Sequence, residues 1–98
     1  MKTIPPFILV PKPLNKDAES LSKFKYAEDH VGTRHQLGGN PEFLQEADWP
    51  LCPDCGGRMT FYGQLDSIND EFVLADCGMI YIFVCFDCNT VESFMQSN

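Results

Sequence analysis

Two Cys-x-x-Cys pairs constrain the fold of this chain more than any other feature. The first lies in "LCPDCGGRM", residues 51–59, and the second in "VCFDCNT", residues 84–90. Two thiolates separated by two residues can hold one side of a metal ion from a single tight turn, and a second such turn completes the tetrahedron. The sequence therefore predicts a fold that brings two distant turns together around one ion. The predicted ligands are Cys52, Cys55, Cys85 and Cys88.

The expected metal is zinc in a structural role. Four thiolates leave no open coordination position for water or substrate, so this site is predicted to stabilise the fold and not to catalyse a reaction. A rubredoxin-like iron site uses the same four ligands, so the sequence does not distinguish zinc from iron. A redox pair would open a helix after a strand, whereas "CPDC" runs into Gly-Gly and a predicted strand. Because structural zinc binding contributes on the order of 10 kcal/mol, we expect the metal-free chain to be largely unfolded or molten.

Residues near the cysteine pairs complete this interpretation. Gly56 and Asn89 follow the two pairs, and both residue types tolerate the positive φ that such a turn needs. Cys77, the remaining cysteine, is expected in or beside the core as a small apolar residue. His30 and His35 are expected to be surface or capping histidines, because no triad spacing surrounds them.

The hydrophobic pattern predicts a mainly β fold, a small antiparallel sheet with a zinc-ribbon-like four-cysteine site and little helix. Residues 59–66 alternate in polarity, which is typical of a half-buried strand. Residues 79–85 are almost continuously apolar, which predicts a central strand buried on both faces. The predicted strands cover residues 59–66, 71–75, 79–85 and 90–96. The proline-bracketed apolar run over residues 5–13 suits a short edge strand or an extended segment, because Pro cannot donate to a ladder.

The chain of 98 residues is long enough for one hydrophobic core. We therefore expect residues 1–98 to form a single zinc-stabilised β domain, with an extended or irregular segment over residues 1–30 and the motif-bearing core over residues 31–98. Residues 14–29 are polar with an ambiguous pattern, and a short helix around residues 17–25 is one interpretation of it. The "QLGGNPEFLQ" stretch, residues 36–45, must contain a turn, and Phe43–Leu44 is expected to dock that turn on the core.

Charge is unevenly distributed. The net charge is −7, with +1 in residues 1–30 and −8 in residues 31–98. Such a surface repels phosphate backbones, so nucleic acid is not expected as a partner. The sequence has no apolar run long enough for a transmembrane helix and no recognisable signal peptide. We expect a reducing cytoplasm, where clustered cysteines more often bind metal than form disulfides.

The order of three motifs resembles a known family. "LGGNPEFLQ", "CPDCGGRMTFYGQLDS" and "DCGMIYIFVCFDC" resemble the YwqG-like family of uncharacterised bacterial proteins and, more distantly, the programmed cell death protein 2 family of eukaryotes. The resemblance covers residues 37–88 and implies a β-rich fold without a known enzymatic activity; the eukaryotic relatives look like ribosomal-protein chaperones. The matching positions are Gly38, Gly39, Pro41, Cys52, Cys55, Phe61, Gln64, Asp76, Gly78, Tyr81, Phe83, Cys85 and Cys88.

These motif residues also have structural interpretations. Gln64 and Asp66 are expected on the sheet face opposite Phe61 and Leu65, where they would tie the Gly-Gly-Asn-Pro turn to the sheet by hydrogen bonds. Trp49 is expected to pack in the core or to cover the first cysteine turn.

The leading functional hypothesis is a non-catalytic, zinc-stabilised protein-interaction module whose acidic surface engages a basic protein, for example as an inhibitor of a toxin-like partner. No catalytic residue and no cofactor site other than the metal is predicted. One alternative is a nucleic-acid-binding zinc ribbon. Another is a small enzyme that uses Asp66, Asp76 or His35 in a pocket near the Gly38–Gly39 turn, although no pair or triad spacing supports it.

Overall fold

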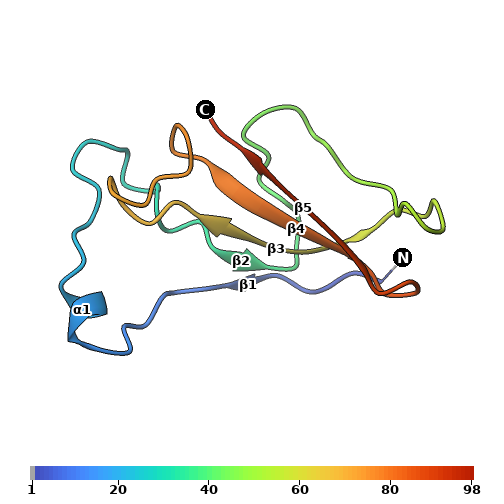
Figure 1. The fold of residues 1–98 in the computed structure, drawn as a ribbon, viewed down its shortest axis with the longest axis horizontal. Helices are drawn as coiled ribbons and strands as arrows, with labels where there is room; N and C mark the ends of the chain where they lie inside the picture. Colours follow the sequence, from blue (N-terminus) through green and yellow to red (C-terminus); the bar gives the residue numbers. More distant parts are fainter. Residues whose placement is uncertain (1) are drawn as a thin grey trace.

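Five antiparallel strands form one sheet in the order β1-β2-β3-β4-β5 (Figure 1). The structure is a computed structural model and describes residues 2–98. It confirms the mainly β prediction, since the described helix is a single turn, α1. The elements are β1 (Phe7–Ile8), α1 (Lys16–Glu19), β2 (Gln36–Leu37), β3 (Thr60–Asp66), β4 (Met79–Cys85) and β5 (Thr90–Gln96).

The three long strands form a meander in which each strand pairs with the next along the chain. β4 lies between β3 and β5, pairing Tyr81 with Gln64 on one side and with Phe94 on the other. The antiparallel turn between β4 and β5 carries the second cysteine pair, and the chain that enters β3 carries the first. The meander therefore brings the two pairs to the same end of the sheet.

A β-bulge in β3 changes which face each side chain occupies. Phe61 pairs with Phe83, but Gly63 pairs with Ile82, so an extra residue is inserted between these two pairs. Directly paired residues share a face of a sheet. Phe61 and Gln64 therefore lie on the same face, and the predicted strict alternation is wrong across the bulge. The prediction that Gln64 and Asp66 lie on the face opposite Phe61 is therefore wrong. The prediction that they lie on the face opposite Leu65 is correct.

The hydrophobic core lies on one face of the sheet and is rich in aromatic rings. Phe83 is fully buried, stacks on Phe94 with ring centroids 5.8 Å apart and meets the edge of Trp49 at 5.3 Å. Phe43 packs on Tyr81 at 5.3 Å, which confirms that the segment after the Gly-Gly turn docks on the core. The Tyr81 hydroxyl donates to the Glu42 carbonyl and so fixes this covering segment to the sheet.

The other face of β4 is only half-buried. Side chains on the core face, such as Tyr81 and Phe83, are fully buried, while Ile80, Ile82 and Val84 between them are partly exposed. The prediction that residues 79–85 are buried on both faces is therefore wrong, because the covering segment packs on the core face alone.

Residues 71–75 do not form the predicted strand. The side-chain oxygen of Asn69 accepts hydrogen bonds from the backbone N–H groups of Glu71 and Phe72, and the Ser67 hydroxyl accepts from Leu74. These local hydrogen bonds hold the segment as a loop and compete with strand pairing. Phe72 and Val73 consequently remain exposed.

The N-terminal third is largely irregular. The proline-bracketed segment contributes only Phe7–Ile8 as a strand, which pairs with β2 at the edge of the sheet. The helix expected over residues 17–25 is restricted to Lys16–Glu19, where Asn15 caps its first turn through a side-chain hydrogen bond from Ala18 N–H. None of its residues is buried, so packing does not extend it further.

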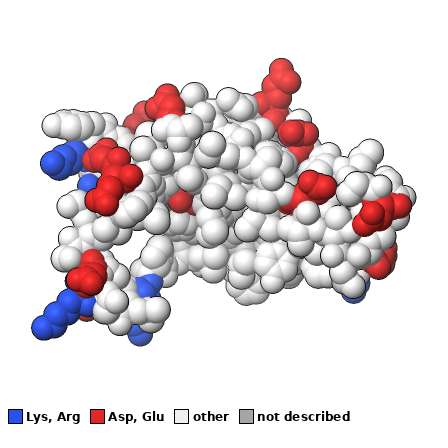
Figure 2. Space-filling model, viewed as in Figure 1, with Lys and Arg blue, Asp and Glu red and all other residues white. Residues whose placement is uncertain are grey.

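Basic side chains are concentrated in one region of the surface, whereas acidic side chains are spread more widely. Figure 2 shows Asp and Glu side chains along the upper rim and at the right end of the molecule, while the left end carries most of the Lys and Arg side chains together with further Asp and Glu side chains. The left end in this view holds α1 and its flanking segments (Figure 1). Over residues 2–98, no helix has the length and apolar character that crossing a membrane requires.

Candidate metal centre

The first cysteine turn is closed by backbone hydrogen bonds. The N–H of Gly56 donates to the Cys52 carbonyl at 2.8 Å, and the N–H of Cys52 donates to the Gly57 carbonyl at 2.7 Å. Gly56 has a φ of +73°, as expected from its residue type. An isolated bridge between Leu51 and Arg58 lies outside these hydrogen bonds. This narrow loop presents both of its cysteine side chains on the same side.

The second cysteine turn connects β4 to β5. Cys85 is the last residue of β4, and Cys88 lies in the turn that follows. Asn89 has a φ of +55°, which confirms the prediction that this position takes the left-handed conformation. The Thr90 hydroxyl donates to the Asp54 carboxylate at 2.6 Å and so links the second turn to the first.

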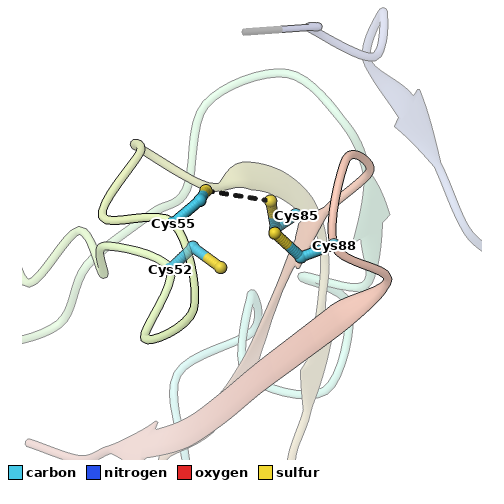
Figure 3. Close-up of side chains that lie close together, drawn as sticks. All are labelled: Cys52, Cys55, Cys85 and Cys88. Carbon is cyan, nitrogen blue, oxygen red and sulfur yellow. Dashed lines mark hydrogen bonds between the residues drawn. The ribbon is translucent and has the colours of Figure 1, made fainter.

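The two turns bring the four predicted ligands together (Figure 3). Their sulfur atoms all lie within 4.8 Å of one another, and the Cys55 and Cys85 sulfurs are 3.8 Å apart. A tetrahedral zinc ion with Zn–S bonds of about 2.3 Å requires sulfurs about 3.8 Å apart. Within residues 2–98 all five cysteines are free thiols, so no disulfide competes for these atoms. The four cysteines could therefore hold a metal ion, and the donor set suits a thiophilic one.

Burial differs among the four cysteines. Cys52 and Cys85 are buried, Cys88 is half-buried and Cys55 is exposed. Cys52 and Cys85 belong to the core cluster together with Met59 and Phe83. An ion at this point would therefore join the hydrophobic core on one side and face solvent on the other.

Neighbouring groups separate the acidities of the thiols. The backbone N–H of Cys55 is the largest of several influences that lower the pKa of Cys52 to about 7. The Cys55 sulfur is the largest of those that raise the pKa of Cys88 to about 12. For Cys55, the N–H of Gly57 lowers the pKa, but nearby sulfurs and burial outweigh it and the net pKa is raised. The turn itself thus stabilises a thiolate on Cys52 by lowering its pKa, while a bound cation would be needed to deprotonate Cys55 and Cys88 near neutral pH.

Trp49 supports the first turn from the core side. Its indole N–H donates to the Met59 carbonyl at 2.6 Å, and the Arg58 guanidinium lies 4.2 Å from its ring centroid. The ring also packs against Phe83 in the core. The expected core role of Trp49 is therefore confirmed, and its contacts connect the entry of β3 to the aromatic cluster.

His35 and Asp66 are buried, so His35 does not take the first of its two expected roles, surface or capping. The backbone N–H of Asp66 donates to His35 Nδ1 at 3.0 Å. The Asp66 carboxylate is occupied by Arg34, which donates from Nε at 2.8 Å and from Nη2 at 2.7 Å. Further donors to the same carboxylate are the N–H groups of Gly32 and Arg34. These groups fasten the strand-like segment around residue 34 to β3.

Arg34 is the residue that sequence reasoning missed. Its guanidinium also donates to the Cys77 carbonyl at 2.9 Å, so it connects three separate segments. Asp66 lies 32 positions away in the sequence, and no local spacing links the two residues. The one available signal is composition, since Arg34 and Arg58 are the only cations in residues 31–98.

The remaining predicted residues lie apart from the metal centre. Cys77 is half-buried in the turn before β4 with a φ of +52° and lies outside the core cluster. His30 is exposed and 3.5 Å from Glu28, and Asp76 is exposed. Gln64 accepts from Glu42 N–H at 2.9 Å, which confirms that it ties the segment after the Gly-Gly turn to the sheet.

Fold and site together define a small antiparallel β domain with a four-cysteine cluster suited to a metal ion. The chain is similar to a protein of Salmonella typhimurium named uncharacterized protein YpfL, with 39% identity over 64 residues. The likeness covers 65% of this chain but 15% of that relative, so the matching region spans only a small part of the relative's length. It supports a relationship to an uncharacterised bacterial family. No family model matches the chain, and no solved structure matches it significantly.

Proposed function

We propose that the chain is a non-catalytic protein-interaction module whose sheet is held together by a structural zinc ion. The observation that carries the proposal is the convergence of four sulfurs within 4.8 Å of one another. With all four positions of a tetrahedral ion taken by protein, the ion would have no site for substrate or water. The proposed role of the metal is to fasten the β4–β5 turn to the entry of β3.

Zinc is the proposed metal because it prefers tetrahedral thiolate sites and undergoes no redox change in a reducing compartment. Mass spectrometry of the protein under native conditions, after expression in medium with trace zinc and iron, tests this directly. The expected result is one zinc ion per chain. Iron as the bound metal, or a metal-free folded chain, would contradict the zinc assignment.

The proposed partner is a basic protein in the cytoplasm. The core-forming residues 31–98 carry a net charge of −8, and a doubly charged ion on four thiolates would add two further negative charges. A concentration of negative charge steers a cationic partner and repels nucleic acid. The acidic rim in Figure 2 is the surface proposed to meet this partner.

Charge variants test the proposed partner. Glu46, Asp48 and Asp87 are exposed, and their replacement by Gln or Asn removes three charges without touching the core. The matched control replaces Lys12, Lys16 and Lys23 by Gln. A partner captured from cell extract at physiological salt, identified and then titrated as purified protein, should bind the acidic-surface variant at least about tenfold more weakly than the control. Equal binding of both variants would overturn the acidic-surface proposal.

We also propose that the chain is related to the YwqG-like family and, more distantly, to the programmed cell death protein 2 family. What supports this relationship is that residues of the shared motifs have connected structural roles in the fold. Gly38 and Gly39 both have positive φ values, Gln64 binds the segment that follows them, and the cysteines converge.

A further inference from the structure

Within residues 2–98 the sheet face opposite the core is apolar and only partly covered; Thr60, at one end of β3, is buried, and its hydroxyl donates to the Lys2 carbonyl. One row of paired residues crosses all five strands on this face, from Phe7 through Leu37, Gly63 and Ile82 to Ser93. A second row pairs Leu65, Ile80 and Met95, and a third pairs Thr60, Val84 and Val91. We call this set of strand residues the open face.

Several apolar side chains on the open face are exposed to solvent. Phe7 is 55%, Leu65 43%, Val91 60% and Met95 49% exposed. On the opposite face Phe61, Tyr81 and Phe83 are buried, and Phe43 and Phe94 pack against them. Sheets with one bare face normally carry polar residues there, so this face has the composition of a surface that is covered in the working protein.

The open face carries no charged residue at any of its strand positions. Lys2 lies at one end, over the ring of Phe86. The chain as a whole has a net charge of −7, and a surface of one sign opposes the approach of two identical molecules. Two copies that meet through an uncharged face keep their acidic groups at the periphery, where solvent and salt screen them. The open face is thus a part of the surface through which two copies can approach with reduced repulsion.

The area of the open face is close to the lower limit for the interface of a specific dimer. Three strands of seven residues, about 4.8 Å apart and rising about 3.3 Å per residue, give a planar footprint of about 330 Å². The short strands β1 and β2 extend it, and side chains such as Phe7 and Val91 stand above the plane, so the accessible area is larger than the footprint. Two copies would together bury roughly the 1,000 Å² that a small specific interface needs.

We propose that two copies of this chain associate face to face through the open face and form a two-layer β-sandwich. Sheets packed in this way lie about 10 Å apart with their strands at about 30°. Ile82 lies at the middle of β4, and its pairing partner Ser93 lies beside it, so both residues are close to the two-fold axis of such a dimer. The inference goes beyond the proposed function and does not require the basic partner.

Sedimentation velocity of the full chain, at concentrations from about 1 μM to about 500 μM, tests the proposal, because an interface near the lower size limit is expected to dissociate in the micromolar range. The protein is expected to change from monomer to dimer across this series. Ser93→Lys places two like charges near the axis, and we expect it to weaken the dimer at least about tenfold. Ser93 is exposed, so the substitution leaves the core unchanged.

The matched control is Gln45→Lys, an exposed position in the segment that covers the core face. It adds the same charge and is expected to dimerise like the unsubstituted chain. Metal content and circular dichroism are measured for each variant and do not depend on dimerisation. They distinguish a variant that has not folded from a folded variant that does not dimerise. A chain that stays monomeric throughout the series would overturn the proposal. Dimerisation of Ser93→Lys as strong as that of Gln45→Lys would also overturn it, because it would place the contact elsewhere, for example along the free edge of β5.

Discussion

Arg34 and Asp66 form a buried, bidentate ion pair that joins the segment before β2 to β3. Nη2 lies 2.7 Å from Oδ1 and Nε lies 2.8 Å from Oδ2, and the two side chains are 6% and 0% exposed. Burial alone would raise the pKa of Asp66, but the hydrogen bonds from Arg34 and Gly32 outweigh it, and the net pKa is lowered. The stabilisation from this carboxylate is therefore fully present above its unfolded-state pKa of about 3.9 and is lost as the pH falls through the lower folded-state value.

We predict that Asp66→Asn destabilises the metal-loaded protein by about 3–5 kcal/mol at pH 7, because it leaves the Arg34 guanidinium buried without a counter-charge. The measurement is the free energy of unfolding from urea titration. Asp76→Asn is the matched control, since Asp76 is exposed, and it should change stability by less than about 0.5 kcal/mol. If the two variants unfolded at the same urea concentration, the ion pair would not have the role assigned to it.

Removal of the metal is predicted to unfold the domain or leave it molten. Structural zinc contributes on the order of 10 kcal/mol, which equals the whole stability of an ordinary domain. Cys88→Ser removes one of the four ligands, whereas Cys77→Ser changes a cysteine outside the cluster. We expect Cys88→Ser to lose metal and the near-ultraviolet circular dichroism of the aromatic core, and Cys77→Ser to keep both. A chelator that strips the metal without moving the melting temperature would show that the ion is dispensable for folding.

The cysteine cluster was predictable because its spacing alone indicates a tight metal-binding turn. Gly56 and Asn89 were likewise predictable, since few residue types adopt positive φ. The strands of the meander followed from periodicity and composition. In each of these cases the information is local, within a few residues of the feature that it predicts.

The errors concern interactions between distant residues or between side chain and backbone. The bulge between Phe61 and Gly63 depends on pairing with β4 and leaves no mark in the alternating pattern. Nothing near His35 in the sequence indicates a partner for its side chain, because the donor is the backbone N–H of Asp66, far along the chain. The apolar run of β4 indicates two buried faces, but nothing local reveals that residues 2–98 bury only one of them fully.

Metal uptake near pH 7 is predicted to release more than two protons per ion. The pKa of Cys88 is raised to about 12, that of Cys55 is raised, and that of Cys52 is about 7. At pH 7 the metal-free cluster thus keeps the protons of Cys55 and Cys88 and about half of that of Cys52, and all must leave when thiolates bind the ion. Apparent affinity should then rise more than about 100-fold between pH 6 and pH 7. Calorimetric titration in buffers of different ionisation enthalpy measures the proton count, and a value below two would contradict this ordering of thiol acidities.

Gly38 is predicted to be far less replaceable than Gly56, although both have positive φ values, +59° and +73°. A Cβ at Gly38 would collide with the backbone carbonyl oxygens of Ile4 and Pro5, whereas a Cβ at Gly56 would meet nothing within 4 Å. Gly56→Ala should therefore cost only the strain of a left-handed alanine, about 1 kcal/mol. Gly38→Ala adds a backbone collision that must displace the N-terminal segment from β2. We expect it to cost at least about 1 kcal/mol more than Gly56→Ala and to expose the amides around Ile4 and Leu9 to hydrogen exchange, which is measured by mass spectrometry on the metal-loaded protein. Equal stability of the two alanine variants, with unchanged exchange at the N-terminal segment, would show that this segment does not depend on the turn.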